Sequence, residues 1–95
     1  MQTIDKEINI NGKKIKFQLP EEDVATKIIL NQLIYERHIT YFFVTQQIQK
    51  NYINIIDLGG NFGYHTCLFA TFSPDINVIT VEPNPDILGI LKYNI

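Results

Sequence analysis

An acidic residue followed by closely spaced glycines is the feature of this sequence best suited to chemistry. The stretch Ile55–Thr66 reads IIDLGGNFGYHT, in which Asp57 follows apolar residues and the glycines come next. Glycines let a backbone turn sharply and approach a ligand without an intervening Cβ. Free N–H groups at the start of a following helix favour polar or anionic groups. The stretch therefore predicts a ligand-binding turn between a strand and a helix, and we expect Gly63 to let that helix pack closely on its strand.

The spacing of the turn predicts a ligand that carries a positive charge. The pattern Asp57-x-Gly59-x-Asn61-x-Gly63 differs from the G-x-G-x-x-G pattern of dinucleotide-binding proteins. A carboxylate before the glycines would repel a pyrophosphate but attract an ammonium group. S-adenosylmethionine, which carries an ammonium and a sulfonium, fits such a turn better than a dinucleotide does. We expect Asn61 to tolerate a left-handed backbone and to cap the helix, and Gly60 to serve only the backbone conformation.

A second acid, Glu82, ends the next apolar segment about 20 residues past the glycines, where a carboxylate can accept hydrogen bonds from ribose hydroxyls. If the two segments are neighbouring parallel strands, Asp57 and Glu82 lie along one rim. They would then hold opposite ends of a ligand that joins a nucleoside to an amino acid. The structural alternatives are that Asp57 caps a turn and that Glu82 is a solvated strand end.

A hairpin is predicted before these segments. Residues 7–19, EININGKKIKFQL, alternate apolar and polar residues around Asn11-Gly12, a strong signal for a two-residue turn. Pro20 is expected to stop the second strand. The expected inward side chains are Ile8, Ile10, Ile15, Phe17 and Leu19.

Two helical segments are predicted after the hairpin. Residues 21–37 begin with acids and predict a helix whose apolar stripe contains Val24, Ile28 and the Ile34 region. Residues 39–50 predict a second helix, with a strand as the alternative for ITYFFV. The aromatic residues of this segment are expected in the core: Tyr41, Phe42 and Phe43.

The second half of the chain alternates strand and helix. Residues 52–58 predict a strand buried on both faces, 62–72 a helix and 76–82 another strand. Asn84 then caps a final helix with Pro85 at its first position. This order predicts a parallel sheet with a right-handed crossover. The residues expected on one face of the final helix are Ile87, Leu88, Leu91 and Ile95.

Composition indicates an ordinary globular protein. The chain has 95 residues, of which 45% are hydrophobic and 19% charged, and its net charge of -2 suggests no basic face for nucleic acid. We find no apolar signal peptide or membrane span, and Cys67 is the only cysteine. We therefore expect a cytoplasmic protein without a nucleic-acid or membrane partner. Cys67 is expected in the core, His65 in a structural or solvent-facing role, and Glu36 as a helix-end acid.

The predicted elements make an incomplete fold. Two strands cannot form a doubly wound sheet, and the sequence stops inside an amphipathic helix. We therefore expect the amino-terminal part of a larger fold. Residues 1–50 would form a hairpin plus a helical segment, and residues 51–95 the first β-α-β-α part of a cofactor-binding domain. Apolar faces left open in this way favour self-association.

The sequence resembles the class I S-adenosylmethionine-dependent methyltransferases and, within them, the FkbM family. The stretches IIDLGGNFGYHTCLFA and VITVEPNPDILGILKYNI carry the resemblance. Asn61 stands where other class I enzymes have a central glycine, EPNP occupies 82–85, and the helix ends in L-x-x-N-I at 91–95. Upstream, LIYERH matches a Tyr-Glu pair common before this motif.

This resemblance implies an α/β, Rossmann-like class I methyltransferase fold and methyl transfer from S-adenosylmethionine, often to an oxygen of a small molecule or sugar. The residues that it implies for cofactor binding are Asp57, Gly59, Gly60, Asn61, Gly63 and Glu82.

Two other classes of function stay open. One is another nucleotide-binding α/β enzyme, such as a nicotinamide dehydrogenase, against which the place of Asp57 argues. The other is a non-catalytic remnant or assembly subunit. The sequence assigns neither a catalytic base nor the methyl acceptor, and it contains no metal-ligand spacing.

Overall fold

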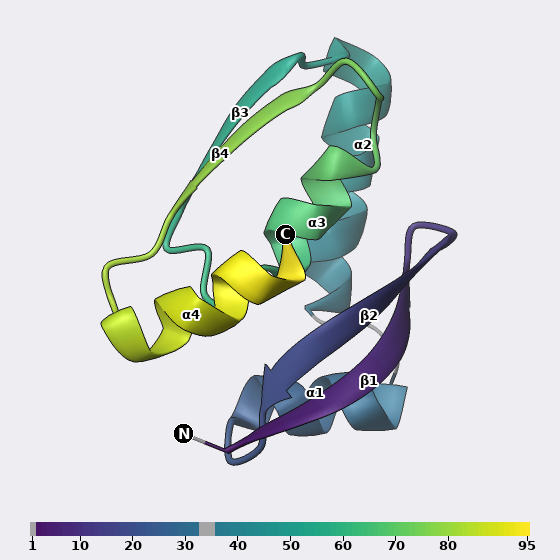
Figure 1. Ribbon diagram of the computed structural model, residues 1–95. Helices are drawn as coiled ribbons and strands as arrows, with labels where there is room; N and C mark the ends of the chain where they lie inside the picture. Colours follow the sequence, from purple (N-terminus) through teal and green to yellow (C-terminus); the bar gives the residue numbers. More distant parts are fainter. Residues whose placement is uncertain (1, 33–35) are drawn as a thin grey trace.

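Two separate two-stranded sheets and four helices make up the part of the chain that the computed structural model describes, residues 2–32 and 36–95 (Figure 1). The chain is thus a small mixed α/β domain, in agreement with the α/β class expected from the sequence. None of the described helices has the length and apolar character needed to cross a bilayer.

The predicted hairpin is confirmed. Strand β1 (Thr3–Ile10) pairs antiparallel with β2 (Lys13–Pro20), and the turn residues Asn11 and Gly12 have φ angles of 51° and 85°. Positive φ at both positions matches the twist of the strands. Four of the five expected inward side chains are buried: Ile8, Ile10, Phe17 and Leu19.

Helix α1 (Val24–Gln32) turns a different side to the core from the one predicted. Val24 is 71% exposed, whereas Ala25, Thr26 and Ile29 are buried. The Thr26 hydroxyl donates to the Pro20 carbonyl at 2.6 Å, which fixes the rotation of the helix against the hairpin. The small side chains of Ala25 and Thr26 suit close packing there. The predicted place of Val24 is therefore wrong, and that of Ile34 lies outside the described residues.

Helix α2 (Arg37–Lys50) confirms a helix rather than a strand in this segment. Phe43 packs edge-on against Phe69 with 4.9 Å between ring centroids. Tyr41 and Phe42 are more than half exposed, so the prediction that all three aromatic residues enter the core is wrong for these two. Consecutive helical residues point about 100° apart, and three in a row cannot face one core.

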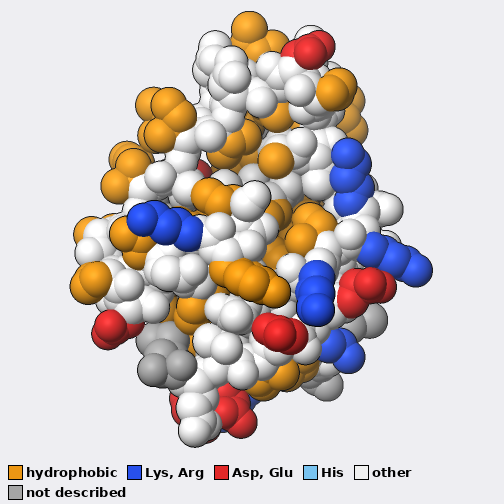
Figure 2. Space-filling view, viewed as in Figure 1, with side chains coloured by type: hydrophobic (Ala, Val, Ile, Leu, Met, Phe, Trp, Pro, Cys, Tyr) orange, Lys and Arg blue, Asp and Glu red, His pale blue; other side chains and the backbone are white. Residues whose placement is uncertain are grey.

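The predicted parallel pairing is confirmed in the second sheet. Strand β3 (Asn54–Leu58) pairs with β4 (Asn77–Val81), and helix α3 (Tyr64–Ala70) connects them and packs on one face. The prediction that β3 is buried on both faces is wrong, because none of the described elements packs over the other face. Apolar side chains lie along the left flank in Figure 2, where these strands run. The exposed residues of that face are Ile56, Leu58, Ile79 and Val81.

Helix α4 (Pro85–Asn94) begins as predicted, because the Asn84 side chain accepts the Asp86 N–H at 3.0 Å and Pro85 follows the cap. Of the four residues predicted to share one face, Ile87 and Leu91 are buried and Leu88 is partly buried. Ile95 is 65% exposed, and the polar Asn94 is the buried residue at the end of the helix.

A single cluster of buried side chains joins the hairpin to helices α1, α3 and α4. Phe17 of β2 meets Phe62 edge-on at 6.3 Å between ring centroids. Cys67 of α3 lies in this cluster, as predicted, and burial raises the pKa of its thiol from 9.0 to about 11.

The raised pKa of Cys67 predicts a loss of stability in alkali. The unfolded chain gives up this proton near pH 9, whereas the folded chain holds it to about pH 11. The free energy of unfolding should therefore fall by about 3 kcal/mol over this window. Urea unfolding of the wild type and of Cys67→Ala would test this. The stability difference between them should be constant below pH 9 and change above it; a constant difference throughout would contradict the prediction.

Candidate functional site

The glycine turn, residues 59–63, has the left-handed backbone that its sequence predicts. Gly59, Asn61 and Gly63 have φ angles of 76°, 54° and 100°. The N–H groups of Gly59 and Gly60 donate to the Val81 carbonyl at 2.8 and 3.0 Å, which ties the turn to the end of β4. Asn61 does not cap the helix as expected, because α3 begins only at Tyr64 and Gly63 occupies the cap position.

Neighbouring atoms leave no room for a side chain at two of the glycines, Gly60 and Gly63, and only Gly63 also has a positive φ. A Cβ on Gly60 would overlap the Thr80 hydroxyl, and Gly60 has no positive φ, so its expected purely conformational role is wrong. A Cβ on Gly63 would lie 2.8 Å from Leu91 Cδ1. Gly63 therefore allows close packing against α4, rather than of α3 on its own strand as predicted.

Asp57 lies next to the end of β3, half-buried, with its carboxylate held by α3. The Thr66 hydroxyl donates to Asp57 Oδ2 at 2.7 Å, and Thr66 Oγ1 also lies 3.2 Å from Thr80 Oγ1. These contacts place a negative charge beside the turn.

Glu82 follows β4 and holds the turn from the other side. Its Oε1 accepts the Asn61 N–H at 2.8 Å, and its Oε2 accepts the Asn84 N–H at 3.0 Å. The sequence analysis considered this carboxylate as a ligand contact or as a solvated strand end, and it missed these two hydrogen bonds to backbone N–H groups. A carboxylate oxygen has two lone pairs, so each oxygen keeps capacity for a second donor.

A cavity of about 120 Å³ opens beside the turn. Four of the six predicted cofactor residues line it, namely Asp57, Gly59, Gly60 and Asn61. Gly63 and Glu82 are absent from its lining. Gly63 ends the turn, and Glu82 holds the turn through the Asn61 N–H. The volume is below the roughly 300–1,000 Å³ of small-molecule pockets, so it could hold only part of a cofactor.

Glu36 and His65, which the sequence analysis did not place in the cofactor site, also line this cavity. Glu36 has a left-handed φ of 49° at the start of α2, and its Oε1 lies 3.1 Å from His65 Nε2. The His65 ring also contacts Phe43 edge-on, at 5.5 Å between centroids, in agreement with its expected structural role. The only sequence signal for Glu36 was the upstream match LIYERH.

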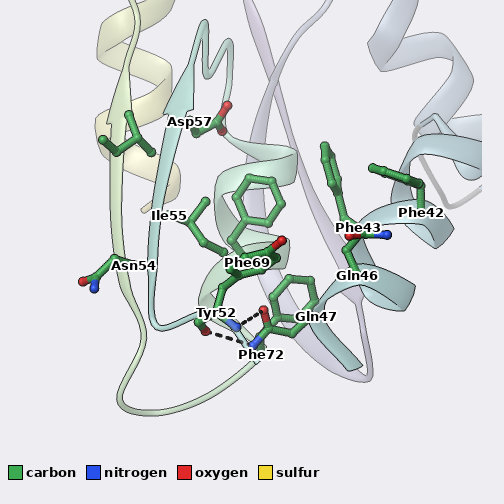
Figure 3. Close-up of a pocket in the computed structure, with 11 residues that line it drawn as sticks. Phe42, Phe43, Gln46, Gln47, Tyr52, Asn54, Ile55, Asp57, Phe69 and Phe72 are labelled. Carbon is green, nitrogen blue, oxygen red and sulfur yellow. Dashed lines mark hydrogen bonds between the residues drawn. The ribbon is translucent and has the colours of Figure 1, made fainter. Parts of the chain in front are cut away.

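A larger cavity, about 480 Å³, lies between α2, β3 and α3 (Figure 3). Its walls include Phe42, Phe43 and Phe69. Asp57 lies at one end and is common to both cavities. At the other end the Gln47 amide exchanges two hydrogen bonds with the Tyr52 backbone, at 3.0 and 3.1 Å. No sequence pattern had indicated this cavity.

Comparisons with protein-family models, curated proteins and solved structures found no match to this chain.

Gly60 is crowded by neighbouring atoms and Gly89 is not, so alanine substitutions at these two positions can be compared. Gly60→Ala would force the new Cβ against Thr80 and should lower the free energy of unfolding by about 1–3 kcal/mol. Gly89→Ala, in the exposed middle of α4 with open space around it, should raise it by about 0.5–1 kcal/mol. Thermal unfolding of both variants tests this. Equal effects of the two substitutions would contradict the packing described at Gly60.

Proposed function

We propose that the glycine turn binds S-adenosylmethionine and that the chain is the cofactor-binding part of a methyltransferase. By its resemblance it would have a Rossmann-like, FkbM-type fold. The reaction would be methyl transfer to an oxygen of a small molecule or sugar. The observation that carries the proposal is the meeting of Asp57, a left-handed glycine turn and Glu82 at the carboxyl ends of two paired parallel strands. Ligands of parallel sheets bind at such ends.

The charges of the site favour this ligand. The Asp57 carboxylate would attract the ligand's ammonium group, because opposite charges stabilise each other at short range. Glu82 could accept ribose hydroxyls with its remaining lone pairs. A dinucleotide would instead bring a pyrophosphate towards two carboxylates.

Methyl transfer asks little of the protein's side chains. The sulfonium already activates the methyl group, so catalysis depends mainly on alignment of the acceptor. An acceptor hydroxyl also benefits from a general base. We assign none of the described residues to that role, and the acceptor's identity is outside the proposal.

Calorimetric titration with S-adenosylmethionine and S-adenosylhomocysteine tests the proposal. Asp57→Asn keeps an oxygen for the Thr66 hydroxyl but removes the charge. It should weaken binding roughly ten- to a hundredfold, since hydrogen bonds to charged groups contribute about 1.5–3 kcal/mol. Asp75→Asn, the same charge change at an exposed turn residue, should leave the affinity unchanged.

The proposal fails if the wild type binds neither compound, or if Asp57→Asn binds as tightly as Asp75→Asn does. A nicotinamide cofactor that raises the melting temperature, with both adenosyl compounds inert, would point to the nucleotide-binding alternative.

A second candidate function is that of an assembly subunit. It is favoured by the apolar sheet face on β3 and β4, where Leu58 is 77% exposed and Ile79 61% exposed. Exposed apolar patches of this kind commonly mark contacts between proteins. The partner that we propose for this sheet face is a second copy of the chain.

Light scattering tests self-association. The wild type should exceed its monomer mass of 11.0 kDa as concentration rises. Ile79→Lys should weaken the association about tenfold or more, because a charge would be buried at the contact. Val24→Lys, at an equally exposed apolar residue on α1, should have no effect. A wild type that stays monomeric, or equal effects of both variants, would exclude this candidate.

A further inference from the structure

Asn94, at the end of α4, is a buried polar residue whose amide nitrogen and oxygen both form hydrogen bonds. It is 6% exposed. Its Nδ2 donates to the Gln18 carbonyl at 2.8 Å and to the Phe62 carbonyl at 2.7 Å, and its Oδ1 accepts the Gln18 N–H at 2.7 Å. A buried amide must find such partners or lose considerable free energy. Asn94 therefore links β2, the glycine turn and α4 through one carboxamide.

The contact with β2 follows from the register of the hairpin. Gln18 lies opposite Asp5. The hydrogen-bonded pairs alternate from Ile10–Lys13 at the turn, so the backbone of Gln18 points away from β1. Asn94 supplies the donor and the acceptor that a third strand would have supplied there. Its carboxamide has the same hydrogen-bonding groups as a peptide unit.

The contact with Phe62 reaches the middle of the glycine turn. The carbonyl of Phe62 is held by Asn94, while the N–H of the preceding Asn61 is held by Glu82. The turn is thus fixed from two sides by side chains of two other segments. Only an amide can meet the demand at position 94, because the three contacts need two donors and one acceptor.

We infer that Asn94 is a positioning residue of the glycine turn and that it acts on cofactor binding through Phe62 without touching the ligand. Its effect on affinity depends on the proposed S-adenosylmethionine site, whereas its effect on the turn does not. A released Phe62 carbonyl would let the turn sample other conformations, so that the cofactor would have to order it on binding.

Two measurements on Asn94→Asp test the inference. Aspartate keeps the shape and the acceptor but loses both donors. Hydrogen exchange of the Asn61 and Gly63 amides should become about tenfold faster or more, and the Kd for S-adenosylhomocysteine should rise by a similar factor. The matched control is Thr26→Val, which removes another buried hydrogen bond, between α1 and Pro20, with no direct contact to the turn residues. It should lower the melting temperature but change neither readout more than about twofold.

Equal changes in the two variants would overturn the inference and leave Asn94 a general stabilising residue. If Asn94→Asp does not fold, amide hydrogen exchange of the wild type at low denaturant concentration tests the inference instead. The Gln18 and Gly63 amides should then open together with the same denaturant dependence, and separate openings would overturn the inference. If S-adenosylhomocysteine binds no variant, the proposed function fails while the exchange result still decides the role of Asn94.

Discussion

The hydrogen-bonding demand of one buried carboxamide connects the parts of this small domain. The hairpin and the β3–β4 sheet share no strand pairing, so they need another link. Apolar packing around Phe17 and Phe62 provides non-directional attraction. The three hydrogen bonds of Asn94 add direction, since they can form only when β2, the turn and α4 have one relative arrangement. The geometry of the turn therefore depends on residues that come before and after it in the chain.

The acids of the site have structural contacts as well as a proposed ligand. Asp57 is oriented by Thr66, and Glu82 holds two backbone N–H groups. Such contacts preorganise a site, because the groups do not have to be ordered when the ligand arrives. The small cavity at the turn and the larger aromatic cavity meet at Asp57. A charged ligand end and an apolar ligand part could therefore lie on either side of this carboxylate.

One face of the β3–β4 sheet is packed against a helix, whereas the other is exposed and apolar. Side chains at alternate positions of paired strands share a face, so Ile56 and Ile79 lie together. Helix α3 covers the opposite face. The exposed face is apolar without a covering element among the described residues. It could favour contact with another surface by the same hydrophobic effect that forms the core.

The sequence by itself determined the features that depend on neighbouring residues. These include the Asn11-Gly12 hairpin, the Asn84 cap, the order of strands and helices after residue 52 and the left-handed turn, because local backbone preferences decide them. Tertiary structure alone decided which side of α1 is buried, why Gly60 must lack a side chain, and that Asn94 and Glu82 hold the turn. These outcomes depend on atoms that meet across distant segments, such as Gln18 and Asn94. The residues near one position in the sequence do not indicate which distant residues will contact it in the folded chain.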